Sequence, residues 1–442
     1  MTPRVTTINW GANGQFPLTI SNPLSQSIAF GFDANTGMMI SQTDPNYTTA
    51  NPLKTTWTYD NFARELSETR PDGTATTFSY NSCSTNGCVN SNNKMTVTKT
   101  AVNVGGSTLA VENIYLDSID RTLVASSTML NGAYDRNEIQ YDNLGRAHQQ
   151  CAPCTFVSCT NYWTTNYYDI LNRLTKSERP ISVTNSTLQT TTIQYTGRTT
   201  TVTDPQGKNT TKINLVTGSL ARTQDHNGYN VNFNYDAFGS LLSVKDSLSN
   251  TLNTMTYDYG LQAFQRSSND ADLGPRSNTY DALGELTAYS DAKGQSFSVL
   301  YDALSRPKTR TEPDLTTTWT WGNTATSFNI GKLQSVAAAS SVGTYSESYG
   351  YDGKTRLSTE QITIPGDAVY TYTLIYNATT GLLDTLQYPV STSGYQLKLQ
   401  YAYQNGVLHQ ISDVATGTHY WTANTINPRG QYTQDTFFPV GP

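Results

Sequence analysis

Proton transfer near neutral pH would depend on the four histidines of this sequence, His148, His226, His409 and His419. His226 lies in RTQDHNG, a turn-forming stretch in which we expect exposure to water. His419 is followed by Tyr420, and a His and Tyr pair of this kind can act as acid and base on a sugar ring. Neighbours in a strand, however, point to opposite faces. We therefore expect no catalytic site, and a polysaccharide-acting enzyme stays a remote alternative.

The five cysteines fall into two groups, CSTNGC and CAPCTFVSC. Because their number is odd, at least one thiol is left over unless it pairs with another chain. A short loop between strand ends can bring Cys83 and Cys88 within disulfide range. His148 and the second group form a possible zinc set, but their spacing is not that of a standard site. We expect a disulfide or buried thiols here, and no metal.

Other ligand-binding motifs are missing or weak. No Gly-x-Ser-x-Gly elbow occurs, and Gly105-Gly106 lies in a hairpin-like stretch with no helix after it, so neither that hydrolase type nor a phosphate loop is indicated. We expect no cofactor. The aromatic clusters TNYWTTNYYD at 160–169 and TTTWTWGN at 316–323 are candidates for binding sugars or partner surfaces.

Composition excludes two classes of partner. The net charge is -6, and Lys and Arg do not form the clusters that replace counterions on nucleic acid. No apolar run approaches the roughly 20 residues that a membrane-spanning helix needs. The N-terminal MTPRVTTINWGANG lacks the basic and then apolar pattern of a secretory signal. We expect a soluble protein that binds no nucleic acid.

The elements that carry these residues repeat along the chain. Charged residues are 14% of the total, Tyr (29) outnumbers Phe (13), and Thr, Ser, Asn and Gly are abundant. Tyr and Thr suit half-buried strands and Asn, Asp and Gly suit turns, so we predict an all-β fold. A phrase that begins Tyr-Asp recurs, with Tyr141, Tyr168 and Tyr195 each 27 residues apart. The residues assigned to this structural motif are Tyr59, Asp60, Tyr141, Asp142, Gly145, Arg146, Tyr168, Asp169, Arg173, Tyr235, Asp236, Gly239, Tyr280, Asp281, Gly284, Tyr301, Asp302, Arg306, Tyr351 and Asp352.

The stretch NTYDALGELTAYSDAKGQSF at 278–297 shows one unit. We expect a strand that ends at Tyr280, a turn at 281–284, a returning strand at 285–289 and a second turn at 291–294. Asp at the first turn position accepts hydrogen bonds from the backbone two residues on, and Gly at the last tolerates positive φ. We also expect each Tyr ring to stack on its equivalents in neighbouring units, because a hairpin buries its face only against the next one.

Copies such as YDNLGRA at 141, YDILNRL at 168, YDALGEL at 280 and YDALSRP at 301 resemble the YD repeat, also called the RHS repeat. The resemblance covers essentially the whole chain. Members of this family include bacterial polymorphic toxins and the B and C components of insecticidal toxin complexes, with teneurins as animal relatives. Their repeats form a continuous β-sheet strip that spirals into a hollow shell, and in the toxins this shell encloses an effector.

From the resemblance we expect residues 1–442 to be a single YD-repeat array, with less regular copies at 81–135 and 322–345. Its antiparallel hairpins would form one spiralling sheet, a partial hollow shell. The implied function is a non-catalytic shell or scaffold segment of a secreted or cell-surface bacterial protein, which encapsulates or presents a toxin or effector. The partners would be the rest of a larger RHS protein or the enclosed effector polypeptide. Open sheet edges also invite self-assembly.

Another function and another fold are also compatible with parts of the sequence. A surface carbohydrate- or receptor-binding adhesin module would use the exposed aromatic clusters. A β-propeller would need blades of about 40 to 45 residues, but odd and even copies do not alternate as blades require. The family's toxins cleave themselves at a D-P-x-G-L motif, whose nearest match here, DPQGK at 204–208, we interpret as a second turn and not as a cleavage site.

Overall fold

Hairpins account for nearly all of the structure. The computed structural model describes residues 4–83, 88, 92–151, 153–155, 162–182, 184–261 and 263–438. Within them lie 37 strands and two 3-10 helices of three residues, so the predicted all-β fold is confirmed. The unit at 278–297 forms as expected, because β24 (Gly274–Tyr280) ends at the motif Tyr and β25 (Leu286–Ser290) returns after the turn.

The remaining elements follow in chain order. The first are β1 (Thr7–Asn9), β2 (Thr19–Ser21), β3 (Ser27–Phe32), β4 (Met39–Thr43), β5 (Lys54–Tyr59), β6 (Glu65–Thr69), β7 (Ala75–Ser82), β8 (Met95–Val102) and β9 (Thr108–Leu116). Next come β10 (Thr122–Ser127), β11 (Asp135–Tyr141), β12 (Ala147–Cys151), β13 (Cys154–Thr155), β14 (Trp163–Tyr168), β15 (Leu174–Ser182), β16 (Asn185–Thr196) and β17 (Thr199–Thr203). They are followed by β18 (Asn209–Asn214), β19 (Leu220–Gln224), β20 (Asn230–Tyr235), β21 (Leu241–Lys245), β22 (Thr251–Asp258), η1 (Tyr259–Leu261), β23 (Phe264–Asp270), β26 (Ser296–Tyr301) and β27 (Pro307–Thr311). The last are β28 (Leu315–Trp321), η2 (Ala325–Ser327), β29 (Leu333–Ser340), β30 (Gly343–Tyr351), β31 (Leu357–Thr363), β32 (Val369–Tyr376), β33 (Leu383–Val390), β34 (Gln396–Gln404), β35 (Val407–Asp413), β36 (His419–Ile426) and β37 (Tyr432–Phe437).

All 37 strands belong to one sheet, in which nearly every strand pairs antiparallel with the next along the chain. Around β13 the order changes, because β12 pairs with β14 and β13 pairs with the first residues of β11. The register shifts at the motif Tyr in many hairpins, as between Asn234 and Tyr235. Bulges of this kind bend a strand and increase its twist, so their repetition curves the whole strip in one sense. A single sheet of this kind is not a propeller.

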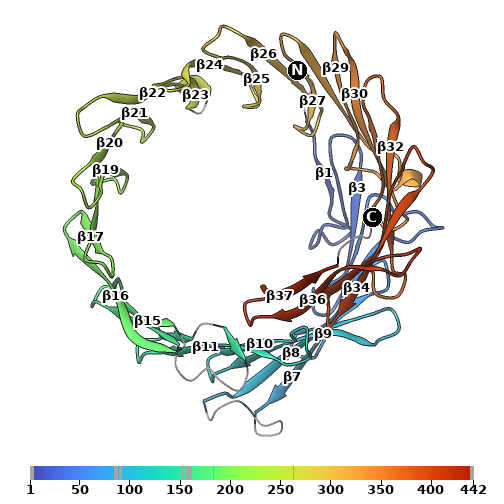
Figure 1. The fold of residues 1–442 in the computed structure, drawn as a ribbon, viewed down its shortest axis with the longest axis horizontal. Coiled ribbons are helices and arrows are strands. Elements are labelled where there is room, and N and C mark those ends of the chain that lie inside the picture. The colour runs from blue at the N-terminus through green and yellow to red at the C-terminus, as the bar shows by residue number, and fades with distance from the viewer. Residues whose placement is uncertain are drawn as a thin grey trace.

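The strip closes into a ring and continues past its own start (Figure 1). It runs from β1 and β3 through β9, β16 and β20 and returns to its start, after which β30 to β36 lie beside the strands from β3 to β10. Arg4, just before β1, bonds Glu285, just before β25, at 2.9 Å, so one wind takes 24 strands. The 37 strands therefore make about one and a half winds.

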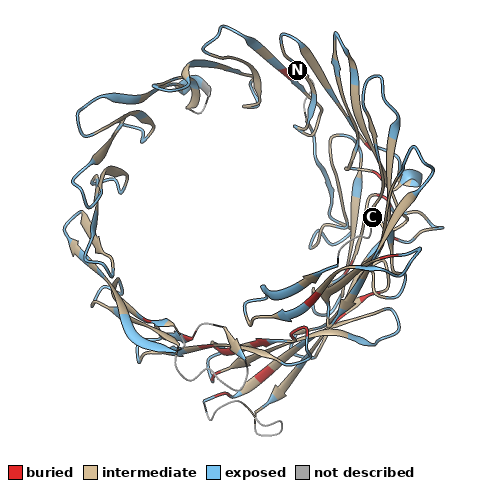
Figure 2. Ribbon diagram, viewed as in Figure 1, coloured by how far each residue is buried: buried red, intermediate tan, exposed pale blue. Residues whose placement is uncertain are grey.

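Burial follows the overlap of the two winds (Figure 2). None of the described residues from 181 to 298, where the strip is a single layer, is buried. Leu53, Leu130 and Ala423 lie in the overlapping part and are only 1%, 4% and 1% exposed. A single sheet has both faces in water, so apolar surface is removed from water chiefly where a second layer covers it. The core of this shell therefore lies along the line where the winds meet.

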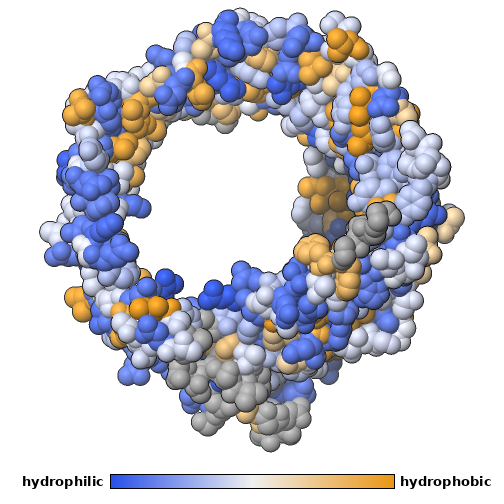
Figure 3. Space-filling model, viewed as in Figure 1, coloured by the Kyte–Doolittle hydropathy of each residue, from blue (hydrophilic) through white to orange (hydrophobic). Residues whose placement is uncertain are grey.

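The centre of the ring is open. In the space-filling view an opening passes through the molecule, with polar and apolar side chains mixed around it (Figure 3). In the part of the chain that the structure describes, no helix is long and apolar enough to cross a membrane.

Candidate functional site: the repeat motif and the seam between the winds

Each motif Asp organises its turn through its carboxylate. Asp142 Oδ1 accepts the backbone N–H groups of Leu144 and Arg146, both at 2.9 Å, and Oδ2 accepts Nε–H of Arg146 at 2.7 Å. Gly145 takes the last turn position with φ of +80°, where a side chain would be strained. The three bonds to Asp recur in other copies, at Asp60 with Arg64, Asp117 with Arg121, Asp169 with Arg173, Asp302 with Arg306 and Asp352 with Arg356.

Other copies keep only part of this arrangement. In the turns of Asp236 and Asp281 the place of Arg is taken by Ser240 and Glu285, whose backbone N–H groups still bond the Asp carboxylate. Gly239 and Gly284 have φ of +88° and +82° there. The backbone turn is therefore common to the copies, while the ion pair belongs to some of them.

The same bonds lower the pKa of the motif carboxylates. For Asp142 the backbone N–H of Arg146 is the main cause, and the Arg146 guanidinium adds to it against the opposing effect of burial. The pKa of Asp169 is lowered in the same way by Arg173. These carboxylates are therefore anionic turn-formers at neutral pH, as the D-x-x-G pattern predicts.

The motif Arg connects one hairpin to the next. The guanidinium of Arg146 lies over the ring of Tyr168, 4.9 Å from its centre, and the Tyr168 hydroxyl donates to the Ala147 carbonyl at 2.8 Å. Arg therefore pairs with the Asp of its own turn and packs on the Tyr of the following copy. Equivalent Arg and ring pairs are Arg64 with Tyr80, Arg121 with Tyr141, Arg173 with Tyr195, Arg306 with Trp321 and Arg356 with Tyr376. The hydroxyls of Tyr59, Tyr141, Tyr235, Tyr301 and Tyr351 likewise donate to carbonyls of the preceding hairpin.

The predicted ladder of stacked motif tyrosines is wrong. Equivalent Tyr residues are two strands apart, roughly 10 Å, which exceeds the distance over which aromatic rings interact. In the copies that have the motif Arg, Arg146 and its equivalents fill that gap. At Tyr280 another side chain fills the gap. Phe264 of the preceding copy stacks on the Tyr280 ring, with the two ring centres 5.1 Å apart.

The two rows of turns form two different edges of the strip. We call the edge made by the turns after the motif aromatic residues the YD edge, which includes residues 142–146, 302–306 and 352–356. We call the opposite edge the return edge, which includes residues 44–53, 70–74 and 129–133. In the described chain, the side-chain bonds between winds join the return edge of the first wind to the YD edge of the second.

This seam consists mainly of side chains that bond backbone carbonyls. Lys354 Nζ donates to the Pro71 carbonyl at 2.7 Å, and Asn51 bonds the Gly353 carbonyl. Asn405 Nδ2 donates to the carbonyls of Met129 and Leu130 at 3.1 and 3.0 Å. These bonds join residues 275 to 302 positions apart. The seam thus closes the ring, and none of the described strands of one wind pairs with a strand of the other.

Two further contacts show how closely the edges meet. The Val104 N–H donates to the Thr379 carbonyl at 2.9 Å. Asn46, 1% exposed, accepts the Ile330 N–H at 2.7 Å through its side-chain oxygen. A Cβ on Gly381 would lie 2.7 Å from a carboxylate oxygen of Asp72, so glycine is needed there for close approach.

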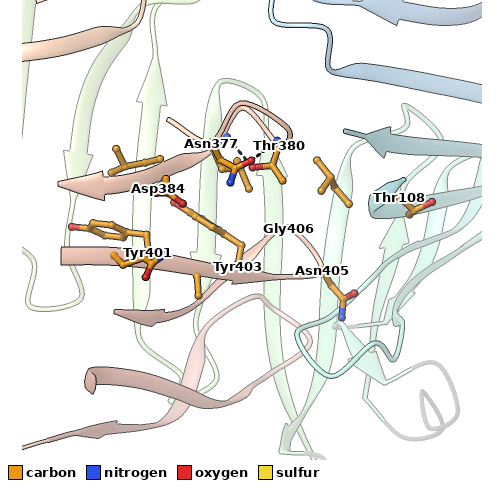
Figure 4. A pocket seen from close by; sticks show the side chains of 13 residues that line it. Thr108, Asn377, Thr380, Asp384, Tyr401, Tyr403, Asn405 and Gly406 are labelled. Carbon is orange, nitrogen blue, oxygen red and sulfur yellow. Dashed lines mark hydrogen bonds between the residues drawn. The ribbon is translucent and has the colours of Figure 1, made fainter. Parts of the chain in front are cut away.

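Gaps remain along the seam. One cavity of about 430 Å³ lies between Thr108 of β9 and the side chains of Asp384, Tyr401 and Tyr403 from β33 and β34 (Figure 4). Burial, with the charge of Asp384 adding to it, raises the pKa of Tyr403. Hydroxyl, amide and carboxylate groups surround this space, which suits water or a polyol.

A larger cavity of about 750 Å³ includes part of the aromatic cluster at 316–323. Trp319 and Trp321 of β28 line it together with Lys308, and Leu24 of the first wind contributes from across the seam. Trp321 holds the position of a motif Tyr, and its indole N–H donates to the Pro307 carbonyl at 2.8 Å. Aromatic faces and the cations Lys308 and Arg306 therefore line the same cavity.

The histidines do not converge on one site. His419 Nδ1 lies 2.8 Å from Gln410 Nε2, whereas the Tyr420 hydroxyl donates to Asp413 at 3.0 Å, so the two neighbours bond different partners. His148 Nδ1 bonds the Asn166 carbonyl oxygen at 2.9 Å, and His226 is exposed in its turn. No acid and base pair is assembled from these residues in the described chain.

Of the described cysteines, three are in disulfides and one is a buried thiol. Cys83 and Cys88 form a disulfide with Cα atoms 5.3 Å apart. Cys154 is also disulfide-bonded, while Cys159 lies outside the described residues. Cys151 is buried, and burial raises the pKa of its thiol. The described residues contain no group of three or more His, Cys, Asp or Glu side chains arranged to hold a metal.

The sequence contained a signal for the Arg contacts but none for the seam. Arg follows the motif Asp by four residues at 64, 121, 146, 173, 306 and 356, and this spacing could have indicated a shared structural role. The residues that close the seam, such as Asn51 and Asn405, follow no pattern. DPQGK at 204–208 forms a return-edge turn, in which Asp204 accepts the N–H of Lys208 at 2.9 Å.

Comparisons with known proteins identify the fold. No family model matches the chain, and no curated protein matches it. Among solved structures it is similar to the crystal structure of TcdB2-TccC3-TEV, with a TM-score of 0.55 and 13% identity over 93% of this chain and 32% of that one. It is also similar to TcdB2-TccC3 without the hypervariable C-terminal region (TM-score 0.53, 13% identity, 96% of this chain and 31% of that one) and to the Photorhabdus luminescens Tc holotoxin pore (0.51, 13%, 92% and 32%).

At such low identity these likenesses show a shared fold. The expected architecture, one spiralling sheet of antiparallel hairpins, is thereby confirmed. This chain spans about a third of the length of the solved chains that it matches.

Proposed function

We propose that this chain, which has the fold of a YD-repeat shell, forms a non-catalytic wall segment of a secreted toxin complex that encloses or presents an effector polypeptide. The observation that carries the proposal is the seam, because it turns a flexible strip into a closed ring around an open centre. Asn405, Lys354 and Asn51 hold the second wind on the first. A wall with this closure confines a polypeptide without binding it through a specific pocket.

The comparisons support this proposal at the level of architecture. One of the similar solved structures is a holotoxin pore by name, and the likeness to it extends over 92% of this chain. A larger protein or further chains would complete the container.

Enclosure can be tested by protease protection. An unfolded, epitope-tagged polypeptide is fused after Pro442, and its cleavage is followed over time in the intact chain and in a variant whose seam is weakened by Asn405→Asp. Enclosure predicts slower cleavage in the intact chain than in the variant. Equal cleavage rates, with both proteins still folded by circular dichroism, would contradict it.

A second candidate function is glycan binding at the larger cavity. Trp319, Trp321 and Lys308 together offer aromatic faces and an ammonium group, which suits a sugar that carries an acid group. A glycan array with the intact chain and with Trp319→Ala tests this candidate. Binding that disappears in the variant supports it, and an array without specific binding by the intact chain refutes it.

A further inference from the structure

The two edges of the strip are covered in one half of the molecule and bare in the other. Leu144 and Leu304 hold the same turn position on the YD edge, two residues after the motif Asp. Leu304 is half-buried beside Ser305, which Arg4 of the first wind contacts at 2.6 Å. Leu144 lies on the first wind, where none of the described second-wind turns covers this edge, and is 73% exposed. Other exposed apolar residues at YD-edge turns of the first wind are Phe62, Ile119, Leu171 and Phe238.

The return edge shows the reverse distribution. On the first wind Leu53 and Leu130 are buried beneath the YD edge of the second wind. Leu273 takes part in a return-edge turn farther along the chain, where no further wind covers it, and is 81% exposed. Leu248 and Val342 are exposed on the same bare edge.

The bare edges repeat the chemistry that the seam already joins. In the seam Arg356, a motif Arg, approaches Asp72 of the return edge at 3.9 Å. The bare YD edge carries motif Arg residues in the same turn position, among them Arg146 and Arg173. The bare return edge carries the exposed carboxylates Asp272 and Asp314. Both bare edges therefore carry exposed apolar side chains at their turns. The YD edge also carries positive charges and the return edge negative ones, so the two edges are complementary.

We propose that a second copy of this chain continues the seam, with the YD edge of its first wind seated on the bare return edge of its neighbour, which runs from the single-layer part of the first wind into the second. The contact joins two different surfaces, so each added copy leaves one edge of each kind open. It would extend the stack copy by copy and would not stop at a symmetric dimer. The existing seam is the template, because within one chain the same edges already bury Leu53 and Leu130.

Two edge variants and a control test this arrangement by analytical ultracentrifugation. The first variant, Leu144→Glu with Phe238→Glu, blocks the YD edge, and the second, Leu248→Glu with Leu273→Glu, blocks the return edge. Leu300→Glu, in β26 and away from both edges, is the control. All these side chains are exposed, so the fold and the internal seam are expected to stay intact.

The average molar mass measured for the intact chain and for the control should rise with protein concentration. Each edge variant alone should stay at the monomer mass of 48.6 kDa. A mixture of the two edge variants should form a species of twice that mass and nothing larger, because one good YD edge then meets one good return edge. A monomeric intact chain, association that survives in either variant, or a mixture without dimers would overturn the proposal. Since the ring of each chain is unchanged, such a failure leaves the proposed shell function to its own test.

Discussion

Arg356 approaches Asp72 across the seam at 3.9 Å while pairing with Asp352 of its own turn at 2.7 Å. Its guanidinium also lies 4.2 Å from the centre of the Tyr376 ring in the next copy. One side chain thus contacts its own turn, the neighbouring hairpin and the other wind. A motif Arg therefore stabilises both the repeat and the closure of the ring.

The seam predicts a large effect from a small change at Asn405. Asn405→Asp keeps the shape of the side chain but removes both N–H donors to the Met129 and Leu130 carbonyls. Two bonds are lost and a carboxylate faces buried carbonyl oxygens, so we expect a loss of about 2 kcal/mol in the free energy of unfolding. Urea denaturation measures it. Asn143→Asp, in an exposed turn of the first wind, is the matched control and should change little.

The motif Arg should not tolerate replacement by Lys. Arg146→Lys retains the charge but loses the paired bonds to Asp142 and the flat contact with Tyr168. We expect a loss of about 1 kcal/mol in unfolding free energy, since the pair is only partly screened from water. Arg198→Lys, whose exposed side chain lies at another turn, is the control. Equal stability of the two variants would show that Arg146 acts only through its charge.

Acid should weaken the shell within a defined range of pH. The pKa values of Asp142 and Asp169 are lowered in the folded protein by bonds from Arg146 and Arg173. The contribution of these carboxylates is fully present above the unfolded value of about 3.9 and is lost as the pH falls through the lower folded values. We therefore expect the free energy of unfolding to stay nearly level from about pH 7 to 5 and to fall below about pH 4. Urea denaturation at several pH values tests this, and a sharp loss of stability near pH 6 would contradict it.

The single-layer arc should be the least protected part of the molecule. Residues 185–298 contain no buried residue in the described chain, whereas Leu53 and Leu130 are buried under the second wind. Local opening of the arc breaks few apolar contacts, so its amides should exchange with deuterium faster than those of β5 to β10. Hydrogen exchange followed by mass spectrometry measures this difference. Uniform protection along the chain would mean that the seam adds no stability.

The local structure could be predicted because it is encoded within each copy. The Asp carboxylate and the positive φ at the last turn position are properties of four or five adjacent residues, so β24 and β25 lie where their sequence places them. The stacking of tyrosines failed for a geometric reason, since a ring two strands away is beyond contact and Arg146 or Phe264 lies between.

The number of strands in one wind could not be predicted from the sequence, for a different reason. Leu144 and Leu304 are the same residue in the same turn position, yet one is exposed and the other is beside the seam. What distinguishes them is the number of strands in a wind, which depends on small curvatures added over 24 strands. No local pattern fixes that sum, and so Asn51, Asn405 and their carbonyl partners could not be recognised in advance.

One sheet winds about one and a half times around an open centre and is held by its own edges. Electron cryomicroscopy of the isolated chain tests it most directly. We expect a ring with a hole through the middle, two layers high over roughly half its circumference and one layer high over the arc that includes residues 185–298. A filled particle, separate lobes or an uncoiled ribbon would contradict it.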